Sequence, residues 1–398
     1  MGVLHAGLLA AQLVAVPTAA EIRALQYTGD AEAALRAAES LVTTQPTDIT
    51  ARLLAACAAI ETGALGQANG HLRALEGLEC VPPRAVVLRA LLERRIREPK
   101  EAMMKALAAA WSKAGRPDLR EDESPLAWTP PAIGWTRQLS PAERLLFEMP
   151  EREDERLAVA LAASREGKAA PPVAHWQVLG ALTHLECPCE PAQVNAAVER
   201  SFEIVKASEP QNGYSELAEM LAKCPRVLGA RELDRLEAAL RQPLFEYPRA
   251  QAFEEILLLA RGLAPAPERP RAISAWLALD LGAFRLGELG EAQTDSLLRR
   301  RAGRVMEQVG LRLARGTAWL DRHMGVSLAQ RGAKLAGDEA HLAEVKAWSE
   351  EQRAAYQAWS VPKYQMGSWP FSAEWKEWTP DEVDAGRAFL KAIGGGPR

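Results

Sequence analysis

The sequence predicts an all-α protein built from stacked helical hairpins, and three observations support this prediction. Alanine, leucine, glutamate and arginine, which all favour helices, dominate the 398 residues. Runs of Val, Ile and Thr that alternate with polar residues, as half-buried strands do, are missing. Small and bulky residues also recur every 34 residues in the first third of the chain, a period typical of a solenoid.

The repeat is clearest at the turn between two expected helices. Gly29 can adopt the positive φ that ends one helix, and Asp30 can cap the next. Pro46 then terminates the second helix. The residues that recur at the fixed spacing are Gly29 and Gly63; Ala34, Ala68 and Ala102; and Leu41 and Leu75.

This pattern resembles the tetratricopeptide repeat (TPR) family, whose unit is a helix–turn–helix of the same length. The resemblance implies a right-handed α-α superhelix with units at about 15–48, 49–82 and 83–116, in which the recurring alanines lie at close helix contacts. The third unit departs from the family pattern because its turn at residues 97–100 has no glycine. The aromatic residue that opens the family's first helix is absent from all three units.

Beyond the repeats, composition divides the chain into three further parts. Residues 117–141 are rich in proline and read as a connector, with Trp128 and Trp135 expected to pin it to a neighbouring surface. Residues 142–360 resume the helical pattern as a second array of hairpins. Its expected helices are 142–148, 151–165, 173–185, 191–207, 214–223, 230–241, 249–261, 270–286, 291–320 and 327–359.

The last part, residues 361–398, concentrates aromatic residues between prolines. Trp369, Phe371, Trp375 and Trp378 are costly to leave in water, at about 2 kcal/mol each by area. We expect these side chains to dock, either on the chain's own helices or on a partner.

Charge and motifs argue against an enzyme and against a nucleic-acid-binding protein. The net charge is −4, and the basic residues Arg299, Arg300, Arg301 and Arg304 are expected to form a solvated helix face. No Gly-x-Ser-x-Gly elbow or phosphate-binding glycine loop is present. We therefore expect no catalytic residues and no cofactor.

A metal or redox site is the weaker alternative. His184, Cys187 and Cys189 lie within six residues and carry ligands that zinc accepts, but the Cys-x-Cys spacing is tight and no second pair follows. The five cysteines do not suggest a disulfide framework, so we expect a reducing, cytoplasmic location and no bound metal.

The N-terminus leaves a second location open. Val3–Val16 is apolar and is followed by small residues, as in a secretory signal, but no Lys or Arg precedes it. Residues 1–20 could therefore export or anchor the chain as an envelope-associated assembly factor. The other interpretation is a helix packed on the end of the solenoid.

Stacked hairpins create a concave groove lined by the first helix of each pair. The sequence therefore predicts a noncatalytic scaffold or adaptor that holds a peptide segment of a protein partner in this groove. Arginines among apolar residues favour a peptide with acidic groups. The residues expected to line the groove are Arg23, Gln26, Tyr27, Thr50, Leu53, Cys57, Ile60, Arg84, Val87, Leu91, Arg94 and Arg95.

Overall fold

The computed structural model of the chain describes residues 16–77, 81–120, 135–150, 152–183, 185, 191–247, 249–265, 269, 282–378 and 381–394. Within these ranges the regular elements are helices, and β-structure amounts to one isolated bridge between Asn212 and Leu244. The all-α prediction is therefore confirmed for the described part of the chain. No helix in that part is long and apolar enough to cross a membrane.

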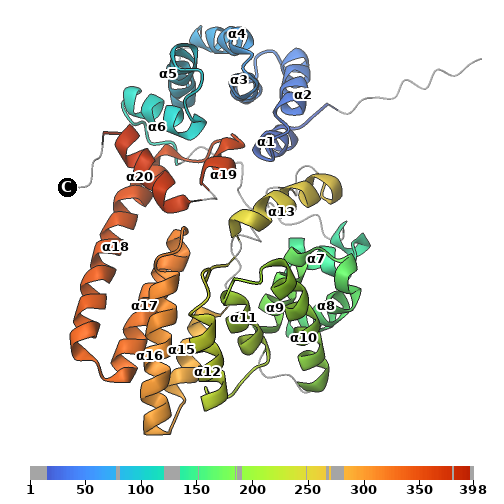
Figure 1. The fold of residues 1–398 in the computed structure, drawn as a ribbon. Coiled ribbons are helices and arrows are strands. Elements are labelled where there is room, and N and C mark those ends of the chain that lie inside the picture. The colour runs from blue at the N-terminus through green and yellow to red at the C-terminus, as the bar shows by residue number, and fades with distance from the viewer. Residues whose placement is uncertain are drawn as a thin grey trace, which may run out of the picture.

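The N-terminal array consists of hairpins that follow one another along the chain. Its helices are α1 (Ala19–Tyr27), α2 (Ala31–Thr44), α3 (Ile49–Thr62), α4 (Leu65–Glu76), α5 (Pro83–Arg97) and α6 (Met103–Lys113). Neighbouring hairpins touch through their first helices, because α1 contacts α3 and α3 contacts α5. Together the six helices form an arc (Figure 1).

The turns of the first two hairpins match the sequence prediction. Gly29 and Gly63 have φ angles of +86° and +80°, which non-glycine residues rarely adopt. The third turn, at residues 98–102, has no glycine and is longer, so α6 begins four residues later than the 34-residue period requires.

This shift changes two assignments made from the repeat. Ala34 and Ala68 are buried as the fourth residues of α2 and α4, but Ala102 is the exposed N-cap of α6. Ala106 takes the buried position in the third hairpin. Asp30 occupies the N-cap of α2 without making the expected side-chain cap, and its carboxylate instead pairs with Arg269 at 2.9 Å.

The second body of the protein is also helical. Its elements are η1 (Trp135–Gln138), α7 (Pro141–Phe147), α8 (Glu153–Glu166), η2 (Gly167–Ala169), α9 (Pro172–Thr183), α10 (Pro191–Ser208), α11 (Tyr214–Ala222), α12 (Ala230–Ala239), α13 (Arg249–Leu263), α15 (Ala283–Glu291), α16 (Ser296–Leu313) and α17 (Trp319–Ala336). Most of the predicted connector, including Trp128, lies outside the described residues, whereas Trp135 begins η1.

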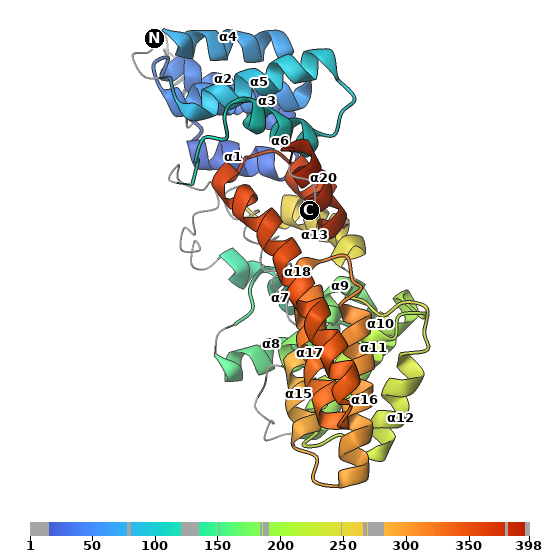
Figure 2. The same cartoon turned by 90° about the vertical axis from the view of Figure 1, so that its left-hand side faces the viewer.

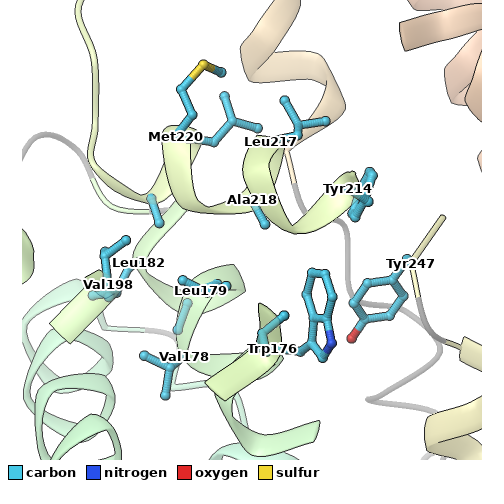
Figure 3. Packing of buried hydrophobic residues seen from close by; sticks show 14 of the residues in the cluster. Trp176, Val178, Leu179, Leu182, Val198, Tyr214, Leu217, Ala218, Met220 and Tyr247 are labelled. Carbon is cyan, nitrogen blue, oxygen red and sulfur yellow. The ribbon is translucent and has the colours of Figure 1, made fainter. Parts of the chain in front are cut away.

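Aromatic packing organises the core of this second body. The ring of Trp176 on α9 lies 6.2 Å from that of Tyr214 and 5.7 Å from that of Tyr247, measured between centroids. Figure 3 shows these rings beside the aliphatic side chains of α9, α10 and α11. The three aromatic residues are buried, so they join the loop after α12 to helices α9 and α11.

Helices α16 and α17 pack at backbone distance through glycines spaced seven residues apart. A Cβ on Gly310 would lie 2.5 Å from the carbonyl oxygen of Gly325, and one on Gly303 would lie 2.7 Å from that of Gly332. Real Cβ atoms do not approach so closely, so the helix spacing depends on glycine at these positions.

The predicted bounds of the helices in this region are wrong. The expected helix 291–320 begins at Ser296, because Asp295 caps it by accepting from the N–H groups of Leu297 and Leu298. The expected helix 327–359 is two helices, α17 and α18, separated by Gly337 at φ +78°.

The long helix α18 (Glu339–Met366) connects the second body to the N-terminal array (Figure 2). It packs along α17, from Val345 to the rings of Tyr356 and Trp359 on Trp319, and it also contacts α20 (Glu382–Ala392). Helix α18 continues through Pro362, past residue 361, where the sequence suggests that the C-terminal part begins. After it, residues 367–372, here called the C-terminal segment, lead into α19 (Ala373–Trp378) without helical structure.

Candidate functional site

The inner side of the N-terminal arc holds the C-terminal segment and a cavity beside it. The cavity measures about 290 Å³ and is walled by α1, α3, α5 and the C-terminal segment. Figure 1 shows α19 entering the inner side of the same arc. The residues that line the cavity are Arg23, Ile49, Thr50, Leu53, Leu54, Cys57, Pro82, Arg84, Leu88, Ser368, Trp369 and Pro370.

Arg84 on α5 holds one end of the C-terminal segment. Its Nη1 donates a hydrogen bond of 2.8 Å to the carbonyl oxygen of Ser368. Its guanidinium also lies over the ring of Trp369, 4.8 Å from the centroid, at a distance typical of a cation–π contact. One side chain therefore contacts both the backbone and an aromatic anchor of the segment.

Two aromatic side chains anchor the segment in the core of the array. Trp369 and Phe371 are 1% and 0% exposed, and their rings stack with centroids 6.1 Å apart. They belong to the same apolar cluster as Ile60 on α3 and Leu91 on α5. The segment is consequently part of the folded core rather than a loose tail.

Glu61, near the end of α3, holds the other end of the segment. Its Oε1 accepts hydrogen bonds from the backbone N–H and the hydroxyl of Ser372, at 2.8 and 2.5 Å. Burial raises the pKa of the Glu61 carboxyl above its usual range, although both bonds from Ser372 oppose this shift. Glu61 is therefore an acid whose burial costs desolvation energy, and it accepts a hydrogen bond from the main chain of the segment.

A second acid holds α19, the helix that follows the segment. The carboxylate of Glu377 on α19 accepts from the N–H groups of Met103 and Met104, at 2.7 and 2.9 Å, and so caps α6 from a distant part of the chain. Burial raises the pKa of this carboxyl.

The thiol at the cavity floor is not a nucleophile. Burial raises the pKa of Cys57 to about 12, against the opposing effects of the Arg84 and Arg23 charges. Because the thiolate is the reactive form, this cysteine serves as a small apolar residue.

The twelve residues predicted to line the groove have three different placements. Those that line the cavity are Arg23, Thr50, Leu53, Cys57 and Arg84. Those that are buried between helices and away from the cavity lining are Gln26, Tyr27, Ile60, Val87 and Leu91. Five of the twelve therefore border the cavity, and another five are buried by the packing of the helices.

Arg94 and Arg95 have a local role. Both Arg94 Nε and Nη2 donate to the Glu101 carboxylate, and Arg95 Nη1 donates to the Glu101 carbonyl oxygen at 2.6 Å. These two arginines therefore hold the turn between α5 and α6.

The four aromatic residues proposed for docking are only partly described. Trp369 and Phe371 dock within the chain, as given above. The side chains of Trp375 and Trp378 lie outside the described part, although both residues belong to α19.

The metal candidates His184, Cys187 and Cys189 lie outside the described residues. Among the residues that are described, no group of three or more His, Cys, Asp or Glu side chains could hold a metal ion. His175, one helix earlier, is buried and bonded to the Ser201 hydroxyl at 3.1 Å and the Gly167 carbonyl oxygen at 2.9 Å. Burial lowers its pKa, so it is a neutral structural histidine.

Cys224 differs from the expectation of reduced thiols. It is disulfide-bonded, and its partner lies outside the described residues. Arg285 donates to its sulfur at 2.7 Å and also to the carbonyl oxygens of Thr183 and Leu185. The disulfide therefore lies where the ends of α9 and α11 meet α15.

The basic cluster on α16 behaves as a solvated helix face. Arg301 pairs with Asp234 and with Glu237 on α12, at 2.5 and 2.8 Å. Arg299, Arg300 and Arg304 are exposed.

The residues missed by sequence reasoning are Glu61, Ser368, Ser372 and Glu377. Glu61 carried a usable signal, because it is a lone acid that directly follows the long apolar run 53–60 of α3. The other three lie far along the chain from their partners, and local pattern carries no information about such pairings.

Comparison with known proteins supplies no relative. No protein-family model, curated protein sequence or solved structure matches this chain. The functional interpretation therefore depends on the geometry of the site.

Proposed function

We propose that the protein is a noncatalytic interaction scaffold. In this proposal α1–α6 form a short right-handed TPR-like solenoid that holds a peptide segment of a protein partner on its inner face. One observation carries the proposal. This face already holds a non-helical segment of the same chain, through hydrogen bonds to its main chain and through apolar packing.

The contacts to the C-terminal segment combine the two elements of peptide recognition. Arg84 and Glu61 bind its main-chain carbonyl and N–H groups, which any peptide offers. Buried aromatic side chains add affinity and select sequence, as anchors do in protein interfaces. The same surface chemistry suits a second peptide lying beside the first.

The C-terminal segment completes the groove in this proposal. Ser368, Trp369 and Pro370 form part of the cavity wall, so the partner contacts both the array and the segment. In the alternative, the C-terminal segment covers the groove, and a partner must displace it in order to bind.

Site-specific photo-crosslinking tests the proposed function. A diazirine amino acid replaces Leu53, which lines the cavity, in the full chain expressed in its source cell. The matched control carries the same group at Leu258, which is 64% exposed on α13. We expect a defined partner peptide to crosslink from position 53 and not from position 258. Identical crosslinks from both positions, or none from position 53, contradict the proposal.

A second candidate is an exported or envelope-associated assembly factor. The disulfide at Cys224 favours it, because disulfides persist mainly in oxidising compartments. The apolar residues 3–16 would supply the export signal. N-terminal sequencing of the native protein tests this: a chain that starts near Glu21 supports export, and one that starts at Met1 or Gly2 with the Cys224 thiol free opposes it.

A further inference from the structure

We propose that the cavity beside Trp369 is a pocket for an acidic side chain of the partner peptide, bound through its carboxylate. This inference rests on the proposed function and specifies the chemistry of the ligand.

The size of the cavity limits what can enter it. At about 290 Å³ it lies at the lower end of the range for ligand pockets. It therefore suits one or two side chains rather than a large cofactor. Its walls come from three helices and the C-terminal segment, so a peptide lying along the arc can insert a side chain between them.

The charge of the lining favours an anion. Arg23 on α1 and Arg84 on α5 both line the cavity, and the described lining residues include no Asp or Glu. Thr50 adds a hydroxyl donor. The guanidinium group has a rigid fork of donors that matches a carboxylate, so this lining favours a carboxylate ligand.

The residues around the arginines keep negative charge from arising within the cavity. Cys57 stays protonated because burial raises the pKa of its thiol to about 12. Glu61, whose charge acts on this thiol, is engaged by Ser372 and is not part of the lining. The first turns of α3 and α5 also border the cavity, and the positive ends of these helices add to the field of the arginines.

The remaining wall of the cavity is apolar, so it favours an apolar residue next to the acidic residue of the peptide. Leu53, Leu88 and Trp369 line it, and a leucine-sized side chain next to the acid would contact them. Arg84 is already held by the Ser368 carbonyl and the Trp369 ring, so little side-chain entropy is lost when it binds a carboxylate. The expected ligand is an acidic residue flanked by apolar ones.

Titration of the purified full chain with two short peptides tests the pocket. The probes are the acetylated tripeptide amides Leu-Asp-Leu and Leu-Asn-Leu, with ligand-detected NMR as the readout because tripeptides bind weakly. We expect Leu-Asp-Leu to bind about tenfold more tightly, since a hydrogen bond to a charged group is stronger than one to a neutral group. Inorganic phosphate in a parallel titration distinguishes an acidic peptide from a free anion.

Matched variants assign any binding to the cavity. Arg23→Gln should remove most of the preference for Leu-Asp-Leu, and Arg23→Lys should restore part of it. Arg36→Gln, which removes a 73% exposed guanidinium on α2, should leave it unchanged. A variant enters the comparison only if its thermal midpoint matches that of the unmodified protein.

Three results would overturn the inference. These are equal affinity for the two tripeptides, phosphate binding without any peptide binding, and loss of the preference in Arg36→Gln. Crosslinking from position 53 is measured separately with the native partner, so the proposed function can stand when the acidic pocket fails. Conversely, if the tripeptide binds but no partner crosslinks from position 53, the cavity is a site for a small ligand and the proposed scaffold function is wrong.

Discussion

At the scale of single residues, the C-terminal segment is held by a few groups with two contacts each. Arg84 binds a carbonyl and an aromatic ring, and Glu61 binds an N–H and a hydroxyl of Ser372. Removing such a group takes away more than one interaction. It also leaves the opposite partner without its hydrogen bond in a buried place, which is the larger cost.

We expect Arg84→Met to lower the free energy of unfolding by about 2 kcal/mol, because the Ser368 carbonyl loses its donor and Trp369 loses its cation–π contact. Urea denaturation measures the change. Arg36→Met on α2 is the control and should change stability by less than about 0.5 kcal/mol, since Arg36 is exposed. Equal losses in the two variants would show that Arg84 does not hold the segment.

His175 gives the protein a pH dependence on the acid side. Its pKa is lowered by burial in the folded state, so the unfolded chain binds a proton first as pH falls. Stability should therefore decrease below about pH 6.5, where histidine in an unfolded chain begins to protonate. In His175→Gln the decrease should be smaller, whereas His323→Gln, at an exposed position, should keep it. Unfolding midpoints between pH 5 and 8 provide the measurement.

At the scale of elements, the hairpin turns could be predicted and the distant contacts could not. Gly29 and Gly63 were identified because the period places glycine where the chain must reverse. The register of α6 was missed because the turn after α5 is longer than its counterparts. Ala102 keeps the 34-residue spacing by chance, and this coincidence conceals the longer turn.

The α16–α17 pair carried a signal that the sequence interpretation did not use. Gly303 and Gly310 are seven residues apart, as are Gly325 and Gly332, so each pair lies on one face of its helix. The helix bounds in this region were misjudged because alanine-rich helical sequence runs past both ends of α17. Asp295 caps the start of α16, Gly337 ends α17 in a left-handed conformation, and Asp338 caps the start of α18.

Substitution of one of these glycines tests the backbone contact. Gly310→Ala should lower the free energy of unfolding by about 2 kcal/mol or more, because its Cβ would meet backbone atoms of Gly325 and Ala329 that cannot move aside. Gly70→Ala in α4 is the matched control, with no heavy atom within 4 Å of the new Cβ. It should raise stability by roughly 0.5–1 kcal/mol through helix propensity alone. A neutral Gly310→Ala would mean that the helices are farther apart than described.

At the scale of the whole molecule, residues near the C-terminal end of the chain pack against its N-terminal helices. Helices α1, α3 and α5 wall a cavity, and a part of the chain near its C-terminal end packs against them. Five of the twelve predicted groove residues line the remaining cavity. Helical phase could suggest which residues line the cavity, but it could not show that residues about 300 positions away pack beside them.

The rate at which the Cys57 thiol is alkylated reports whether Trp369 is docked beside the cavity. In the intact protein its thiol is buried against the cavity floor and has a pKa of about 12, so alkylation at pH 8 should be very slow. Trp369→Ala removes part of the wall that shields it and should increase the labelling rate at least tenfold as the thiol becomes hydrated and its pKa falls. Leu258→Ala, at an exposed position outside the cavity lining, serves as the control and should leave the rate unchanged. Mass spectrometry of the Cys57 peptide follows the reaction, and equal rates in all three proteins would contradict docking of Trp369.

Hydrogen exchange at the amide of Ser372 in the full chain measures whether the arc of α1–α6 holds the C-terminal segment by its main chain. The Ser372 N–H donates a hydrogen bond to Glu61. We expect slow exchange at Ser372 because of this bond, and selective acceleration in Glu61→Ala while amides in the middle of α16 remain protected. Exchange at Ser372 as fast as in an unstructured peptide would show that the groove does not hold the segment, and would remove the basis for a peptide-binding function.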